Sequence, residues 1–490
     1  MIPAEQAPTA ALLGALAGAA PIETHISAVF VGADTVWKLR KAVRLAFVDF
    51  TSVGERERTA RRELELNADS APGLYRDVVA VTRGADGRLA LGGVGEAVDW
   101  VVRMARVPSG DFLDVVAARG GLDAGLLDGL GDAVAALHGR NPVVARDQAR
   151  ALGGVAEGNA RAAGDAGIDL RVIASWLAGM MAQLDRHADG LRGRGEAGFV
   201  RRCHGDLHLG NLCLWGGVPV AFDALEFDED LATVDVGYDL AFLLMDLDVR
   251  VGLAAANRVM NRWLARTGDW AVVAFLPAFL SMRAMVRAHV AAARGEAGES
   301  GRYLDRAAEY LRPGAACVVA IGGLPGAGKS TVARALAPGL GPAPGAVILR
   351  SDEIRKRRFG VAPEERLPQS AYAGRANAGV FGEIIEAAGV IAAAGHAVVA
   401  DATYVDPAHR AALEAGAGAG VPFLGAWLDV PMAELERRVA ARRGDASDAD
   451  LAVLRGAAAS GAGAGGWLAV DGRDTAVAVA AIRATLAIRP

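Results

Sequence analysis

The chain has 490 residues, of which 52% are hydrophobic and 22% are charged, and its formal net charge is −5. This length exceeds what one small domain uses and predicts two or three domains. The composition is typical of a soluble globular protein, and a negative net charge without a long basic run argues against broad nucleic-acid binding.

Three cysteines in so long a chain cannot form a disulfide framework, which favours the reducing cytoplasm. The first residues lack the positive n-region of a signal peptide, and the longest apolar candidate, residues 271–286, contains Pro277 and Arg283. We therefore expect a cytoplasmic protein without a membrane partner, and its oligomeric state is left open.

The first 110 or so residues predict strands around one charged helix, which spans residues 53–67. Strands are expected at residues 26–30, 35–39, 77–82, 89–92 and 100–107. Lys38 lies inside the second strand between two large apolar residues, where a lysine is unusual because such a strand is usually half-buried. It is either a charge that protects a sheet edge or a functional cation.

After a helical stretch, residues 112–191, comes the run Cys203-His204-Gly205-Asp206-Leu207-His208-Leu209-Gly210-Asn211, and then Val220-Ala221-Phe222-Asp223. Phosphoryl transfer to a hydroxyl needs a carboxylate near the attacking oxygen and oxygen ligands for Mg²⁺. The order and spacing of the acidic and amide residues in this stretch fit both requirements. Asp206 would orient and deprotonate the acceptor, while Asn211 and Asp223 would hold the metal.

Two other interpretations of this stretch compete with the catalytic one. Cys203, His204, His208 and Cys213 are zinc-ligand types, but their spacing does not match a usual structural zinc pattern. Polar loop residues without a role are the other alternative, although so many acids and amides in this order favour a kinase site.

The stretch from His204 to Asn211, with Asp223, resembles the catalytic loop and metal-binding aspartate of the aminoglycoside phosphotransferase-like kinases, a branch of the protein-kinase fold. The resemblance covers roughly residues 20–300. It implies that Lys38 contacts the α- and β-phosphates. It also implies that Glu63 is the ion-pair partner of this lysine, with Glu65 as the alternative.

The same resemblance implies that Met104 falls near the interlobe hinge, where adenine binds, and that His204 and Asp239 brace the catalytic loop. One departure is that no G-x-G-x-x-G motif precedes Lys38, so the phosphate lid must differ or be partly missing. Acidic residues are not abundant near the end of this region, so aminoglycoside modification is not the default expectation.

The run Gly323-Leu324-Pro325-Gly326-Ala327-Gly328-Lys329-Ser330-Thr331 fits the phosphate-loop pattern G-x-x-x-x-G-K-[ST], between an apolar strand at 317–321 and a helix at 330–336. The glycines let backbone N–H groups turn toward phosphate oxygens, Lys329 reaches the terminal phosphates, and Ser330 ligates Mg²⁺. An accidental glycine-rich turn is the alternative. The predicted nucleotide contacts are Gly323, Gly326, Gly328, Lys329, Ser330 and Thr331.

Strands and helices then alternate as in a parallel α/β sheet, with strands expected at residues 347–352 and 396–401 that each end in an aspartate. Ligands of such sheets bind beyond the carboxyl ends of the strands, which places Asp352 and Asp401 beside the phosphate loop. Asp401 would hold Mg²⁺ through water, and Asp352 would serve as the acceptor base. Helix N-caps are the alternative for both.

Arg437 and Arg438 lie on a predicted helix that leads, past Arg442 and Arg443, into the polar segment 444–448. Such arginines suit a mobile lid that neutralises charge in the transition state, and Arg438 is the predicted catalytic one. Surface solvation is the alternative. This half is similar to small P-loop kinases such as gluconate kinase, polynucleotide kinase and zeta-toxin-like enzymes, chiefly through residues 351–355.

The whole chain resembles a bacterial family in which an aminoglycoside phosphotransferase-like kinase is fused to a predicted P-loop kinase. We expect a bilobal, protein-kinase-like α+β domain at 1–312, with a small lobe at about 20–107 and a large lobe at about 111–311. A P-loop α/β domain would follow at 316–490. The expected function is ATP- and Mg²⁺-dependent transfer of a phosphoryl group to a small-molecule hydroxyl from two nucleotide sites. The alternatives are a nucleotide-sensing P-loop domain that regulates one kinase, and a kinase that acts on a protein.

Overall fold

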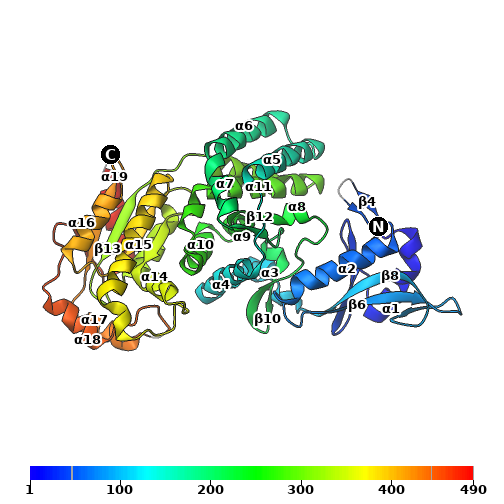
Figure 1. Ribbon diagram of the computed structural model, residues 1–490, viewed down its shortest axis with the longest axis horizontal. Coiled ribbons are helices and arrows are strands. Elements are labelled where there is room, and N and C mark those ends of the chain that lie inside the picture. The colour runs from blue at the N-terminus through cyan, green and yellow to red at the C-terminus, as the bar shows by residue number, and fades with distance from the viewer. Residues whose placement is uncertain (46–47, 443, 489–490) are drawn as a thin grey trace. The chain divides into compact units, whose positions relative to one another are not determined.

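The computed structural model describes residues 1–45, 48–442 and 444–488. The chain divides into two compact units, one formed by residues 1–148 and 192–243 and the other by residues 149–191 and 244–490 (Figure 1). The second unit therefore includes helices that the predicted boundary at 312–316 assigns to the first domain. That boundary stays a prediction.

The first unit contains a six-stranded antiparallel sheet in the order β1-β2-β3-β8-β6-β7, with α2 (Val53–Ala68) packed against β6 and β8 (Figure 1). Ser52 begins this helix, because its Oγ accepts a hydrogen bond from Glu55 N at 3.1 Å. The strands are β1 (Ile22–Glu23), β2 (Ser27–Val31), β3 (Thr35–Arg40), β6 (Tyr75–Arg83), β7 (Leu89–Leu91) and β8 (Glu96–Ala105).

The rest of this unit is mainly helical and carries two short antiparallel strand pairs, β9 with β12 and β10 with β11. The predicted catalytic loop joins β9 to β10, and Asp223 lies just beyond β11. The strands are β9 (Val200–Arg202), β10 (Leu212–Trp215), β11 (Val218–Ala221) and β12 (Thr233–Asp235). A separate antiparallel pair is formed by β4 (Arg44–Leu45) and β5 (Val48–Asp49). The helices are α1 (Ala7–Ala17), α3 (Leu113–Ala118), α4 (Ala124–Arg140), α8 (Glu229–Ala232) and α9 (Val236–Arg250), the last of which continues into the second unit.

The second unit holds a five-stranded parallel sheet in the order β14-β15-β13-β16-β17. Every residue of the central strand β13 (Val318–Gly322) is buried, which explains its continuous apolar sequence. The other strands are β14 (Val347–Arg350), β15 (Val398–Asp401), β16 (Phe423–Asp429) and β17 (Leu468–Asp471). The predicted fold class, a protein-kinase-like α+β fold followed by a P-loop parallel-sheet fold, is confirmed.

Helices surround this sheet, and α13 packs against α19 while α15 packs against α14 and α16. They are α13 (Lys329–Leu336), α14 (Ser351–Arg358), α15 (Gly374–Ala393), α16 (Pro407–Gly416), α17 (Met432–Ala441), α18 (Leu451–Ala459) and α19 (Thr475–Ile488). The remaining α-helices among the described residues are α5 (Gln148–Asp165), α6 (Leu170–Arg186), α7 (Ala188–Glu196), α10 (Leu253–Thr267), α11 (Leu276–Ala293) and α12 (Ala297–Tyr310).

One strand prediction was too long. The strand expected to run to Asp352 ends at Arg350, and α14 begins at Ser351, so Asp352 belongs to a helix. Serine and acidic residues favour the first turn of a helix, where exposed N–H groups carry partial positive charge, and this preference ends the strand early.

One helix in the described part of the chain, α15, is long and apolar enough to cross a membrane by length and composition alone. Its Val380, Ile384 and Ile391 are fully buried, and 39% of its apolar window is buried. A single helix that passes this test is weak evidence for a membrane span.

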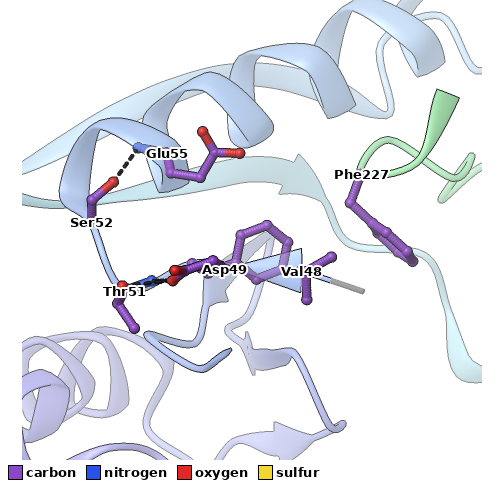
Figure 2. A pocket seen from close by; sticks show the side chains of 7 residues that line it. Val48, Asp49, Thr51, Ser52, Glu55 and Phe227 are labelled. Carbon is purple, nitrogen blue, oxygen red and sulfur yellow. Dashed lines mark hydrogen bonds between the residues drawn. The ribbon is translucent and has the colours of Figure 1, made fainter. Parts of the chain in front are cut away.

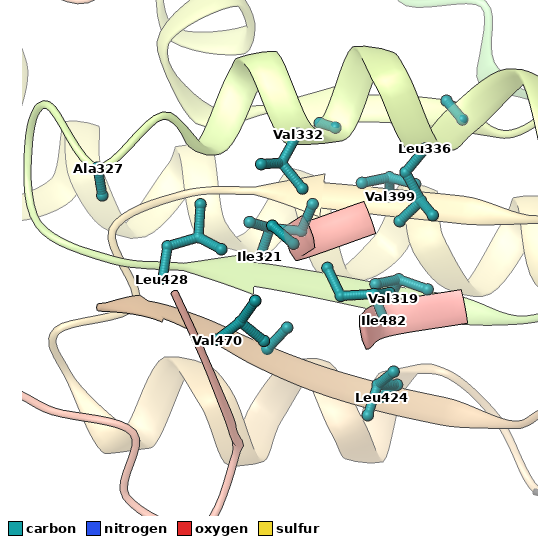
Figure 3. Close-up of a cluster of buried hydrophobic side chains, with 14 of the residues drawn as sticks. Val319, Ile321, Ala327, Val332, Leu336, Val399, Leu424, Leu428, Val470 and Ile482 are labelled. Atoms are coloured by element: carbon teal, nitrogen blue, oxygen red, sulfur yellow. The ribbon is translucent and has the colours of Figure 1, made fainter. Parts of the chain in front are cut away.

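The core of the parallel sheet lies between β13 and the helices α13 and α19 (Figure 3). Val319 and Ile321 alternate along β13 and meet Val332 of α13 and Ile482 of α19. We expect Ile321→Ala to lower the free energy of unfolding by about 2–5 kcal/mol, because truncation removes apolar contacts and leaves a cavity. Urea unfolding followed by fluorescence measures this. The exposed Val477→Ala is the control, expected within about 0.5 kcal/mol of wild type. Equal effects of both changes would contradict the prediction.

The outer edge strand of the sheet, β14, is covered by side chains of α10. Asn257 Nδ2 donates to the carbonyl of Ala346 at 3.0 Å, and Asn261 Oδ1 accepts from Ile348 N at 2.6 Å. Both asparagines are buried. Backbone groups that would face solvent at a free edge are therefore paired within this unit.

Candidate active sites

In the first unit, Lys38 of β3 contacts side chains from two distant segments of the sequence. Its Nζ lies 2.7 Å from Glu63 Oε1 on α2 and 2.5 Å from Asp223 Oδ1 after β11. Glu65, the alternative partner, instead pairs with Arg62 at 2.8 Å on the exposed side of α2. Burial lowers the pKa of Lys38, but the carboxylates of Asp223 and Glu63 more than offset this and raise it above the usual range. Lys38 is therefore a charged lysine inside the unit and not a solvated edge charge.

Asp206 and Asn211 lie together in the loop between β9 and β10. Asn211 Nδ2 donates to Asp206 O at 3.0 Å and to Asp206 Oδ2 at 2.9 Å. The Asn211 amide nitrogen is thus directed at Asp206, and its carbonyl oxygen is the atom that can ligate a cation. The roles of both residues stay predictions.

The loop is braced from two sides. Asp239 Oδ1 accepts from Gly205 N at 2.8 Å, and its Oδ2 accepts from His204 N at 3.2 Å and lies 3.2 Å from His138 Nε2. His204 Nε2 lies 2.9 Å from Phe222 O, and its Nδ1 accepts from Asp206 N at 3.3 Å. Burial lowers the pKa of His204, which favours the neutral ring that these contacts require. The predicted bracing by His204 and Asp239 is confirmed.

Asp223 has a left-handed backbone, with φ of 60°, which is uncommon for a residue with a side chain. Two residues that sequence reasoning missed hold this conformation. Tyr75 Oη accepts from Asp223 N at 3.0 Å, and Asn67 Oδ1 accepts from Ala224 N at 3.1 Å. Asn67 lies one helical turn after Glu63 on the buried face of α2, and that spacing was the available signal.

The turn in the place of a phosphate lid is short; the lid was expected to differ or be partly missing, and its role stays a prediction. Only a tight turn joins β1 to β2, and Thr24 N donates to Ser27 O at 2.9 Å across it. Lys41 Nζ donates to Thr24 O at 2.6 Å and pairs with Glu23 at 2.7 Å. Met104, the predicted hinge residue, lies near the end of β8 opposite Val36 of β3.

In the second unit, the phosphate loop joins β13 to α13 as predicted. Gly326 has φ of 87°, and a Cβ there would lie 3.0 Å from Leu435 O, so the position requires glycine. Lys329 Nζ donates to the loop carbonyls of Gly323 at 3.0 Å and Leu324 at 3.2 Å. Ser330 Oγ donates to Asp401 Oδ2 at 2.6 Å, which brings the two predicted metal ligands together.

A cavity of about 1280 Å³ opens over this loop. It is lined by most of the predicted site residues of this half, namely Gly326, Gly328, Lys329, Ser330, Thr331, Asp352, Asp401 and Arg438. Neither aspartate is a helix N-cap, because α14 is preceded by Arg350 and α16 by Asp406. Burial raises the pKa of Asp352, while Arg350 opposes that shift.

Arg438 lies within α17, and its contacts differ from those expected of a lid arginine. Its Nε donates to Glu434 Oε1 at 2.6 Å, and its Nη1 donates to Gly472 O at 3.2 Å and to Gly326 O at 3.5 Å. Arg438 thus ties α17 to the phosphate loop and to the turn after β17. Arg442 lines the same cavity, and Arg443 lies outside the described residues.

Arg350 is a site residue that sequence reasoning missed. It is buried at the end of β14, where it pairs with Asp445 and lies 3.6 Å from Asp401. Its position directly before Ser351-Asp352 is the sequence feature from which it could have been predicted. Its partner Asp445 belongs to the predicted lid segment, so Arg350 links that segment to the strand end.

If Asp352 is the acceptor base, its raised pKa sets a pH dependence. A base must be deprotonated to accept a proton. Turnover at the P-loop site should therefore decrease as the pH falls, and the decrease should occur at a higher pH than for an ordinary aspartate, whose pKa is about 3.9. The measurement is kcat against pH in an Asp206→Asn background, which silences the first site. Asp352→Glu should retain an acid limb and Asp352→Asn should lose most turnover. An acid limb at the ordinary aspartate pKa would contradict the prediction.

A smaller hollow of about 420 Å³ lies in the first unit beside the start of α2 (Figure 2). Its lining residues are Val48, Asp49, Phe50, Thr51, Ser52, Glu55 and Phe227. Thr51 donates to Asp49 at 2.6 Å and lowers the Asp49 pKa to about 2. The polar groups here bond to one another, and the hollow matches no predicted site residue.

Comparison with known proteins gives three findings. Residues 318–461 match the AAA_33 family model, described as an AAA domain. Uncharacterized proteins from Mycobacterium tuberculosis and Mycobacterium bovis are each 29% identical to this chain over 462 residues, which is 89% of this chain and 89% of the relative.

The third finding is a set of distant likenesses to solved structures. A gluconokinase from Sinorhizobium meliloti 1021 is 22% identical, with 36% of this chain and 92% of that chain covered and a TM-score of 0.25. A thermostable mutant of aminoglycoside phosphotransferase APH(4)-Ia is 14% identical, with 62% and 98% covered and a TM-score of 0.41. The chain combines a protein-kinase-like fold in its N-terminal part with an AAA_33 P-loop domain in its C-terminal part.

Proposed function

We propose that the chain is an ATP- and Mg²⁺-dependent phosphotransferase with two nucleotide sites, at least one of which transfers the γ-phosphoryl group to a small-molecule hydroxyl. The observation that carries the proposal is the meeting of Lys38 with both Glu63 and Asp223, beside the Asp206–Asn211 pair. A phosphate loop already accounts for one nucleotide site. This second constellation of lysine, carboxylates and amide, in a different fold, supports another.

In the first site, Asp206 orients the acceptor hydroxyl and takes its proton. The hydrogen bond from Asn211 Nδ2 to Asp206 Oδ2 fixes this carboxylate. Lys38 binds phosphate oxygens. The hard oxygen donors of Asn211 and Asp223 fit Mg²⁺, which when bound would neutralise charge on the phosphates. The short turn that Lys41 fixes between β1 and β2 takes the place of a long glycine-rich lid.

In the second site, backbone N–H groups of the phosphate loop and Lys329 hold the phosphates, and Ser330 with Asp401 fits Mg²⁺ because both are hard oxygen donors. Asp352 takes the acceptor proton, and its buried position favours a base that is poised closer to neutrality. Arg350 and Arg442, which line the cavity, add positive charge near the phosphates.

A small acceptor is favoured over a protein because the segment from Asp223 to Asp235 is short and partly occupied by α8 and β12. Protein kinases usually present a longer peptide-docking segment there. We place the activity in the cytoplasm and expect neither a membrane nor a nucleic-acid partner.

The test is a screen of sugars, amino sugars, nucleosides and aminoglycosides with radiolabelled ATP. It uses the full-length chain, the single variants Asp206→Asn and Lys329→Met, and the double variant. Label should appear in at least one acceptor and disappear in the double variant. Unchanged turnover in the double variant would refute the proposal. A third outcome is possible, in which Asp206→Asn removes the product and Lys329→Met changes only the dependence of the rate on ATP concentration. That outcome would make the P-loop half a nucleotide sensor.

A further inference from the structure

A group of buried charges extends beyond the Lys38 contacts, and the phosphoryl-transfer mechanism does not use all of it. Arg40 lies two residues after Lys38 on β3, so both side chains point to the same face of the strand. Its Nη2 lies 2.9 Å from Glu63 Oε2 and also contacts Glu226 Oε1. Arg40, Glu63 and Glu226 are all buried. One carboxylate oxygen of Glu63 therefore pairs with Lys38 and the other pairs with Arg40.

The position of Arg40 is fixed on all sides. Its Nη1 lies 3.0 Å from Ser27 Oγ on β2, and its guanidinium lies over the ring of Phe50 at 5.3 Å. Glu226 follows Asp223 by three residues, and Phe227 borders the hollow of Figure 2. The contact between Arg40 and Glu226 thus fastens the segment that carries Asp223 to the strand that carries Lys38.

The number of carboxylates in this group explains why a cationic side chain is needed in addition to Lys38. Oxygen atoms of Glu63, Asp223 and Glu226 lie within 4.8 Å of one another. Lys38 stays paired with one oxygen of Glu63, and without Arg40 the other oxygen of Glu63 would lie beside the buried carboxylate of Glu226. Neighbouring buried carboxylates repel each other and are costly to bury. Arg40 bonds to both and, together with Lys38, balances their charge.

We propose that Arg40 and Glu226 are positioning residues of the first site, which hold Asp223 in its metal-binding place while Lys38, still paired with Glu63, contacts the nucleotide. This inference rests on the proposed function of that site. Neither residue touches the reacting atoms. They act on Asp223 through the segment 223–226 and on Lys38 through Glu63.

The test measures metal binding without turnover. Mn²⁺ affinity is determined by electron paramagnetic resonance with a non-hydrolysable ATP analogue. The background is Ser330→Ala/Asp401→Asn, which removes the metal ligands proposed for the second site, so that the first site is observed. Arg40→Met should weaken Mn²⁺ binding by about 10–100-fold, the range seen when groups that orient metal ligands are removed. The double variant Arg40→Met/Glu226→Gln should recover most of that loss, because it also removes the uncompensated carboxylate.

Arg103→Met is the matched control, since Arg103 lies on β8 of the same sheet in a half-exposed pair with Asp77. Its Mn²⁺ affinity should equal that of the background. If Arg40→Met does not fold, Arg40→Lys tests the same point by keeping the charge while losing the two-pronged contact. Unchanged Mn²⁺ affinity in the Arg40 variants, or no recovery in the double variant, overturns the inference. If Asp223→Ala also leaves Mn²⁺ binding unchanged, the proposed function of the site fails instead.

Discussion

Lys329→Met is expected to lower kcat/KM at the P-loop site by about 100–1000-fold or more. The lysine amine lies against the carbonyls of Gly323 and Leu324, so it is held over the loop where phosphates bind. A fixed positive charge stabilises the negative charge that develops during transfer, and methionine keeps the length of the side chain while removing that charge. Steady-state kinetics in the Asp206→Asn background measure the effect at this site alone.

The matched control for this change is Arg334→Met, which removes a half-exposed cation from the same helix. We expect its kcat/KM within about twofold of the background, because exposed ion pairs contribute little. Thermal unfolding of both variants should be similar, which separates loss of chemistry from loss of structure. Turnover retained by Lys329→Met would show that this loop does not carry the reaction.

Asp206→Asn should lower kcat at the first site by about 100–10,000-fold and leave nucleotide affinity nearly unchanged. Asparagine can still accept the hydrogen bond from Asn211 Nδ2 through its own carbonyl oxygen, so the loop should keep its shape. What it cannot do is take a proton from the acceptor. Single-turnover kinetics and nucleotide titration in the Lys329→Met background measure the two quantities separately.

Asp86→Asn, in the exposed turn between β6 and β7, is the control for loss of one carboxylate, and it should leave both quantities unchanged. A parallel loss of kcat and nucleotide affinity in Asp206→Asn would indicate collapse of the loop instead of loss of a base. Full activity in Asp206→Asn would remove this residue from the mechanism.

The parts of the fold that could be predicted are those encoded in short stretches. The central strand before Gly323 is apolar throughout because it is buried on both faces, and Lys38 stood out because it interrupts an apolar strand. Asp206, Asn211 and Asp223 could be proposed from their order and spacing alone. In each case the signal lies within about twenty residues of sequence.

The rest depends on contacts between residues far apart in the chain. Arg40 and Glu226 are 186 positions apart, and Asn67 meets Ala224 across 157, so neither pair leaves a local pattern. Arg438 was predicted from its helix and its neighbours in sequence, and its role stays a prediction, whereas its partners Gly326 and Gly472 come from two other loops. Asp352 was assigned to a strand because the preceding apolar run hid the helix that starts at Ser351.

The asparagines of α10 have a consequence for how the P-loop half can be handled. Cutting the chain between residues 312 and 316 would remove Asn257 and Asn261, and the outer edge of β14 would lose the partners of Ala346 O and Ile348 N. An unpaired edge strand is a template for strands of other molecules, so the excised fragment should self-associate through β14. A fragment that begins before α10 keeps both asparagines and should resist aggregation. The helix α10 therefore contributes to the solubility of the P-loop half.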